Sequence, residues 1–91
     1  MIVAHIEYQK IDTFGNYAVL KSLDYNVTDL INFTHITSAD NYYLVWKKAQ
    51  WVYQHPEDID REKLEITDLI INDKKGKPKM FYKYIITFKK G

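Results

Sequence analysis

The chain has 91 residues, a formal net charge of +1 and no cysteine. This length corresponds to one small domain, and a hydrophobic content of 46 % is too high for a disordered chain. Because cysteine is missing, a disulfide framework, a thiolate zinc site and a cysteine nucleophile are excluded. We expect a single compact domain over residues 1–91, with no cofactor and no metal site.

The sequence shows no signal for a membrane or for secretion. No apolar run reaches the roughly 18 residues that a transmembrane helix needs. The start, Met1–Glu7, lacks the basic region of a signal peptide and already contains an acidic residue. These features predict a cytoplasmic protein without a membrane partner. The many Lys, Ile, Asn and Tyr residues are typical of an AT-rich genome, such as that of a low-GC bacterium or its phage.

The N-terminal part of the chain is predicted to form a β-hairpin. Apolar and polar residues alternate over Ile2–Ile11 and again over Tyr17–Leu23, which is the pattern of two strands. Residues 12–16 between them contain Gly and Asn, which tolerate the positive φ of a tight turn. The residues that share one face of the first strand are Ile2, Ala4, Ile6 and Tyr8.

The C-terminal part of the chain predicts a second hairpin. Its strands are Leu64–Asn72 and Lys79–Lys89, joined by a turn over residues 73–78. The alternation of the first of these strands slips around Thr67 and Asp68, which indicates a β-bulge. The last strand has the clearest alternation in the chain. One of its faces is predicted to carry Met80, Tyr82, Tyr84, Ile86 and Phe88.

The middle of the chain is predicted to hold one short strand and the main helix. Leu30–Ile36 is rich in Thr and aromatic residues, which favours a third strand over a helical turn capped by Thr28. Apolar residues at helical spacing predict an amphipathic helix over Ser38–Gln54, which Pro56 would end. The apolar face of this helix is predicted to contain Tyr42, Val45, Trp46, Ala49, Val52 and Tyr53. The competing prediction for the same segment is a pair of strands, Tyr42–Trp46 and Trp51–Tyr53.

Together these elements predict an α+β fold. We expect a small antiparallel sheet of about five strands, including two hairpins, with one main amphipathic helix packed on one face. The physical reason is that the helix and the sheet each have one apolar surface, and both surfaces are buried when the two elements pack together.

The distribution of charge offers one candidate function. Residues 74–91 contain seven lysines and no acidic residue. Lysines that neutralise phosphates, beside aromatic rings that stack on unpaired bases, would make a single-stranded nucleic-acid-binding module. The alternative is that these lysines keep an edge strand soluble. The candidate nucleic-acid-binding residues are Lys74, Lys75, Lys77, Lys79, Lys83 and Tyr82.

Two further features are weaker candidates for chemistry. His5 and Glu7 share a strand face, where a third group would complete a small enzyme or ligand-binding site. No zinc-site spacing, phosphate-binding loop or nucleophile elbow accompanies them, so no catalytic residue is predicted. The acidic segment 57–65 lacks the glycine and the spacing of a calcium loop, and we expect a solvated connector there.

The surplus of aromatic residues is more informative. Tyr43 and Trp51 fall off the predicted apolar stripe of the helix, and Tyr53 lies near its end. Tyr and Trp dominate the binding energy of protein interfaces, so these three residues are the candidate protein-binding site. The alternative is that they pack under loops or against the first hairpin. The sequence therefore favours a non-enzymatic interaction module, such as a small inhibitor or accessory protein, that docks through these aromatics or a sheet edge. The same surfaces would allow a homodimer.

Overall fold

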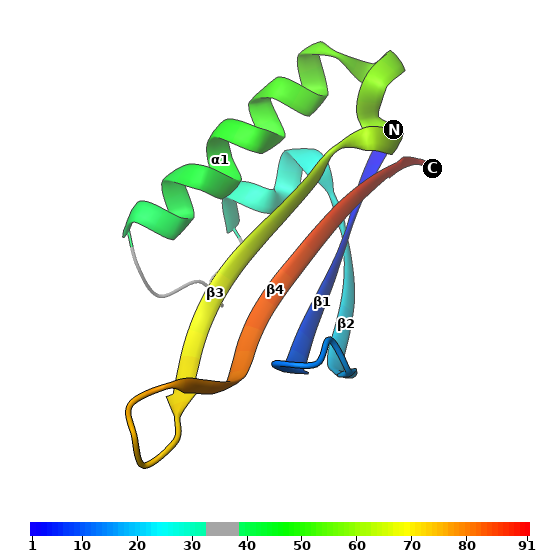
Figure 1. The fold of residues 1–91 in the computed structure, drawn as a ribbon. Helices are drawn as coiled ribbons and strands as arrows, with labels where there is room; N and C mark the ends of the chain where they lie inside the picture. The colour runs from blue at the N-terminus through cyan, green and yellow to red at the C-terminus, as the bar shows by residue number, and fades with distance from the viewer. Residues whose placement is uncertain (33–38) are drawn as a thin grey trace.

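The computed structural model describes residues 1–32 and 39–91, which form a four-stranded antiparallel sheet and one α-helix (Figure 1). In chain order the elements are β1 (Ile2–Asp12), β2 (Tyr17–Asn26), the 3-10 helix η1 (Val27–Asn32), α1 (Ala39–Gln54), the 3-10 helix η2 (Pro56–Arg61), β3 (Lys63–Asn72) and β4 (Pro78–Lys90). The predicted α+β class is confirmed, with four strands in the sheet where about five were expected.

The two predicted hairpins join through the first and last strands of the chain. The strand order is β2-β1-β4-β3, so β1 and β4 are central, and they pair antiparallel from the level of Ile2 and Lys90 onward. Both chain termini therefore lie at one end of the sheet (Figure 1). The two hairpin turns, residues 13–16 and 73–77, lie at the other end, which we call the distal end.

All three helical segments cover the same face of the sheet (Figure 1). The predicted alternation of the first and last strands is confirmed, because Ala4 and Ile6 of β1 are buried together with Ile86 and Phe88 of β4. The other elements add further buried hydrophobic side chains to this core: Val27, Leu30, Val45, Ala49, Val52, Ile59 and Ile66. The residues between them on the strands point to the opposite face of the sheet, which no described helix covers.

The bulge predicted in β3 is confirmed. The pairing register with β4 shifts between Thr67 and Leu69, so that Asp68 is the extra residue. Its carboxylate accepts a hydrogen bond of 2.6 Å from the hydroxyl of Tyr8, which reaches across β4 from β1. The bulge therefore places the Asp68 carboxylate within hydrogen-bonding distance of β1, a strand that does not pair with β3.

The predicted third strand is wrong for the residues that the structure describes. Residues 30–32 belong to η1, and Leu30 is buried in the core. The side-chain oxygen of Asn26 accepts hydrogen bonds from the backbone N–H and the hydroxyl of Thr28, at 3.3 and 3.1 Å. These bonds favour a helical turn directly after β2. Residues 33–36 of the expected strand lie outside the described residues.

The predicted helix is confirmed, and the alternative pair of strands is wrong. Of the residues predicted to form its apolar face, Val45, Ala49 and Val52 are buried. The remaining three do not follow the prediction, because their exposed fractions are 40 % for Tyr42, 41 % for Trp46 and 63 % for Tyr53. The buried stripe of α1 is narrower than the sequence pattern suggested, since the fully buried side chains of the described helix are small or β-branched.

The acidic connector is more structured than a solvated linker. It contains η2, in which Ile59 is 1 % exposed and packs into the core. Glu62 directly after η2 accepts an ion-paired hydrogen bond from Lys48 of α1 at 2.6 Å. This segment therefore joins α1 to the start of β3. In the described ranges, no helix has the length and hydrophobicity needed to cross a membrane.

Candidate functional site

Five aromatic side chains of α1 lie at the protein surface. Their exposed fractions run from 36 % for Trp51 to 63 % for Tyr53. In a soluble amphipathic helix the outward positions are normally charged or polar, so this concentration of rings is unusual. We call these residues the α1 surface: Tyr42, Tyr43, Trp46, Trp51 and Tyr53.

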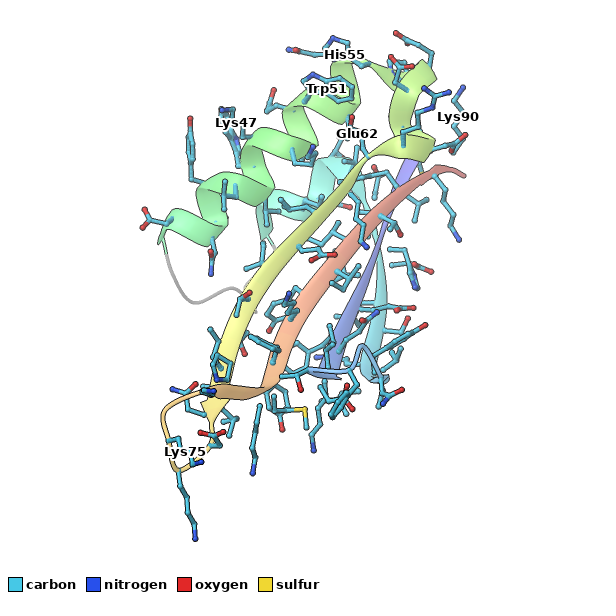
Figure 2. All side chains as sticks on the ribbon, viewed as in Figure 1. Lys47, Trp51, His55, Glu62, Lys75 and Lys90 are labelled. Atoms are coloured by element: carbon cyan, nitrogen blue, oxygen red, sulfur yellow. The ribbon has the colours of Figure 1, made fainter. Side chains whose placement is uncertain are left out.

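The α1 surface extends around both flanks of the helix. Each residue of an α-helix points about 100° away from the previous one, so Tyr43 projects opposite the buried stripe. Its ring stacks on that of Trp46, with centroids 6.2 Å apart. Trp51 lies on the flank near β3, where its ring stacks on His55 at 4.2 Å, and both project from the end of the helix (Figure 2). Tyr53 lies on the opposite flank, towards η1.

The predicted binding residues Tyr43, Trp51 and Tyr53 are thus all exposed, but they point in three directions from one helix. The sequence analysis missed two members of the surface, Tyr42 and Trp46, by assigning them to the core. Helical spacing places both residues next to the buried stripe. Spacing alone does not show how far neighbouring elements extend over the flank of the helix.

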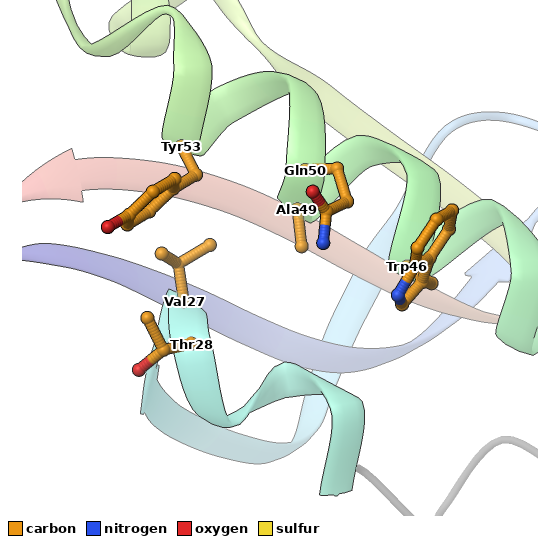
Figure 3. A pocket seen from close by; sticks show the side chains of 6 residues that line it. All are labelled: Val27, Thr28, Trp46, Ala49, Gln50 and Tyr53. Atoms are coloured by element: carbon orange, nitrogen blue, oxygen red, sulfur yellow. The ribbon is translucent and has the colours of Figure 1, made fainter.

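A groove of about 260 Å³ runs between α1 and η1, beside this surface (Figure 3). The rings of Trp46 and Tyr53 lie along it, with Val27 across the gap and Ala49 at its floor. Among the described residues its polar groups belong to Thr28, Gln50, the indole of Trp46 and the hydroxyl of Tyr53, and no acidic or basic side chain lines it. The groove is therefore suited to an uncharged apolar side chain.

The C-terminal lysines do not form one surface. Lys74, Lys75, Lys77 and Lys79 are exposed at the distal end, whereas Lys89 and Lys90 lie at the opposite end of β4. Figure 2 shows this separation for Lys75 and Lys90.

The remaining two candidate nucleic-acid residues point to opposite faces of the sheet. Tyr82 is on the covered face, where its ring stacks on Tyr8 at 6.0 Å. Lys83 is on the uncovered face, with its ammonium 3.8 Å from Glu65 and 5.4 Å from the ring centre of Phe81. The structure therefore does not bring the six predicted residues together.

A polar cluster on the uncovered face centres on His5. Its Nδ1 lies 2.6 Å from a carboxylate oxygen of Asp24 on β2, and its Nε2 lies 3.1 Å from that of Glu7. Only a protonated imidazole donates from both nitrogens, so this arrangement fits an imidazolium between two carboxylates. The hydrogen bond with Asp24, and next the one with Glu7, raises the pKa of His5 above its ordinary value. Gln9 donates to Glu7 at 2.8 Å and completes the cluster.

The cluster lacks the arrangement of a catalytic or metal site. Ser22 lies 3.5 Å from His5 Nε2, which gives the order carboxylate, imidazole and hydroxyl of a nucleophilic triad. However, Nε2 is closer to Glu7, so the nitrogen that would take the proton of Ser22 is engaged by a carboxylate. In the parts of the chain that the structure describes, no three His, Asp or Glu residues are placed to hold a metal ion.

We predict that this cluster makes the stability of the protein depend on pH. Because the folded pKa of His5 is raised, its contribution is complete below the unfolded value of 6.5 and is lost as the pH rises through the folded value. The pKa values of Asp24 and Glu7 are lowered, so their contribution is lost as the pH falls below about 4. The melting temperature of the wild type should exceed that of His5→Gln by about 2–5 °C near pH 5.5 and lose this excess as the pH rises through the raised pKa of His5. A difference in melting temperature that does not change with pH would contradict a stabilising ion cluster around His5.

Comparison with known proteins does not add to this description. No protein-family model, curated protein or solved structure matches the chain.

Proposed function

We propose that the protein is a non-enzymatic interaction module that docks on a protein partner through the α1 surface. The observation that carries the proposal is the exposure of five Tyr and Trp side chains on one helix whose buried stripe is already filled by small residues. Side chains of these types supply most of the binding energy in protein interfaces. A small inhibitor or accessory protein would act in this way, by covering a surface of its partner.

The groove beside α1 supports the same proposal. It lies between Trp46 and Tyr53, two members of the α1 surface, and its lining carries no charge among the described residues. A hot spot typically consists of an aromatic or aliphatic anchor in a desolvated pocket, surrounded by residues that exclude water. The groove would accept such an anchor from the partner while Tyr43 and Trp51 cover the rest of the contact.

The nucleic-acid interpretation receives less support from the geometry. Four of its five lysines lie near the distal turn, but Lys83 lies on the uncovered face beside Glu65, and Tyr82 packs on Tyr8 on the opposite, covered face. A backbone-directed nucleic-acid site needs a connected basic stripe.

The test is affinity capture from a lysate of the source organism with the full chain as bait, followed by measurement of the affinity for the purified partner. Combined substitution of Tyr43, Trp51 and Tyr53 by Ala should weaken that affinity by about 100-fold or more, because each hot-spot truncation costs over 1 kcal/mol. The far-ultraviolet circular dichroism should not change, since all three side chains lie outside the core.

The matched control also truncates three exposed hydrophobic side chains, here in the first hairpin, as Phe14→Ala with Tyr17→Ala and Leu20→Ala. This control should keep the partner's affinity within about threefold. The proposal fails when the α1 variant binds as tightly as the wild type, or when both variants lose the partner equally.

A further inference from the structure

The distal end of the sheet concentrates positive charge. Residues 10–17 and 73–80, which form the two turns and their flanks, contain five lysines, and their only acidic residues are Asp12 and Asp73. All five lysines are exposed. Their ammonium groups form no ion pair with a described residue, whereas three other lysines of the chain pair with glutamates. We call these residues the distal lysines: Lys10, Lys74, Lys75, Lys77 and Lys79.

The two aspartates at this end are engaged within their own turns. Each carboxylate accepts hydrogen bonds of 2.8–3.0 Å from two backbone N–H groups that follow it in the chain. Asp12 also accepts one from the side-chain amide of Asn16 at 3.0 Å. The aspartates therefore hold the turns together and leave the distal lysines open to an anion from outside the protein.

Two aromatic rings stand among these charges. Phe14 in the first turn is 88 % exposed, and Tyr17 directly after that turn is 64 % exposed. A hollow of about 250 Å³ lies beside Tyr17 and is also lined by Lys10, Asn16 and Met80. Because Met80 belongs to β4, the hollow joins the two hairpins. It offers a ring, a cation and a carboxamide to one bound group.

The pairing register brings the two turns to the same surface. Asp12 of β1 is level with Met80 of β4, so the turn that follows Asp12 lies next to the start of β4 at Pro78. Neighbouring strands are only about 4.8 Å apart. Both turns lie at this end of the molecule in Figure 1, and Lys75 projects from the second turn in Figure 2. The rings of the first hairpin and the lysines of the second thus face one ligand.

Exposed lysines beside exposed rings fit a single-stranded nucleic acid. The lysines neutralise phosphates, and the unpaired bases stack on aromatic side chains. An acidic peptide would use the lysines but has no repeated planar group for the rings. A lipid surface would make no use of a hollow that contains Asp12 and Asn16. Because the cations are lysines and not arginines, we expect contacts with the backbone and little sequence preference.

We propose that the distal end is a second binding site, which takes single-stranded nucleic acid without sequence preference. The distal lysines contact successive phosphates, the hollow takes one base against Tyr17, and Phe14 stacks on another. The site differs from the one that the sequence predicted, because residues of the first hairpin replace Tyr82 and Lys83. It shares no residue with the α1 surface and is independent of the proposed docking on a protein.

Fluorescence anisotropy of the full chain with a labelled oligothymidylate of about 15 nucleotides tests the site. The affinity should fall about 50-fold between about 50 and 200 mM salt, which is the effect of roughly four lysine–phosphate contacts. Lys10→Glu with Lys75→Glu should weaken binding at least tenfold, by charge repulsion of the phosphates. Phe14→Ala with Tyr17→Ala should weaken it about tenfold or more through the loss of stacking.

Two controls separate this site from other causes. Lys89→Glu with Lys90→Glu makes the same charge change at the opposite end of the sheet, so the affinity should stay within about threefold. Tyr43→Ala with Trp51→Ala removes two exposed rings from the α1 surface and should also leave the affinity for oligothymidylate unchanged, although it weakens docking on the protein partner. The two proposals therefore fail separately. Circular dichroism checks that each variant is folded.

Three results would overturn the proposal. The first is the lack of binding at low salt, including the case in which vesicles of anionic lipid bind and oligothymidylate does not. The second is a charge reversal at Lys10 and Lys75 that weakens binding no more than the reversal at Lys89 and Lys90. The third is competition by polyglutamate of equal charge as strong as that by unlabelled oligothymidylate, which would show that the bases contribute nothing.

Discussion

Replacing Ile86 by Ala should lower the free energy of unfolding by about 2–5 kcal/mol. Ile86 is completely buried at the centre of β4, where it pairs with Ile6 on one side and with Leu64 on the other. Truncation removes the transfer free energy of three carbon atoms and leaves a cavity that the two neighbouring strands cannot fill. Urea unfolding should show a lower midpoint at an unchanged slope.

An exposed aliphatic residue gives the comparison for this measurement. Leu20 on β2 is 52 % exposed, so Leu20→Ala should change the free energy of unfolding by less than about 0.5 kcal/mol. Equal losses for Ile86 and Leu20 would show that the covered face of the sheet is not the hydrophobic core.

The second large effect is expected in the hairpin turns, which share one construction. In each turn an aspartate, Asp12 or Asp73, accepts hydrogen bonds of 2.8–3.0 Å from the backbone N–H groups two and four residues later. Three residues after the aspartate stands a glycine with positive φ, 87° at Gly15 and 82° at Gly76. An L side chain at such a φ is opposed by steric contact with its own backbone.

Combined Gly15→Val and Gly76→Val substitution should therefore cost about 2–4 kcal/mol, because a β-branched residue costs about 1–2 kcal/mol at each left-handed position and each turn is held by its own aspartate. Thermal or urea unfolding measures the loss. Thr13→Val with Lys74→Val, in the same turns but without positive φ, should cost less than about 1 kcal/mol. A double glycine variant as stable as this control would refute the turn geometry.

Both turns and the faces of the central strands were predictable from the sequence, because their signals are local. The spacing Asp-x-x-Gly marks the turns, and strict alternation in β1 and β4 assigns Ile6 and Ile86 to one face. The slip at Asp68 was readable for the same reason, since a bulge breaks the period of two within a single strand.

The parts that the sequence analysis missed depend on contacts between distant segments. His5 and Glu7 were recognised as neighbours, but Asp24 joins them only because β2 pairs with β1. Likewise, Trp46 and Tyr53 have the spacing of core residues. They are exposed because a groove separates α1 from η1 at their level, with Val27 of η1 across the gap. No pattern within the helix encodes that gap.

Fluorine NMR of the protein with fluorinated tryptophan tests docking through the α1 surface most directly. The only two tryptophans of the chain, Trp46 and Trp51, both belong to this surface. In the free protein their ¹⁹F resonances should respond to solvent, since both indole rings are partly exposed. Addition of the captured partner should shift both resonances and remove that solvent response, as the rings enter the interface. A complex in which both resonances keep their free positions and their solvent response would contradict docking through α1.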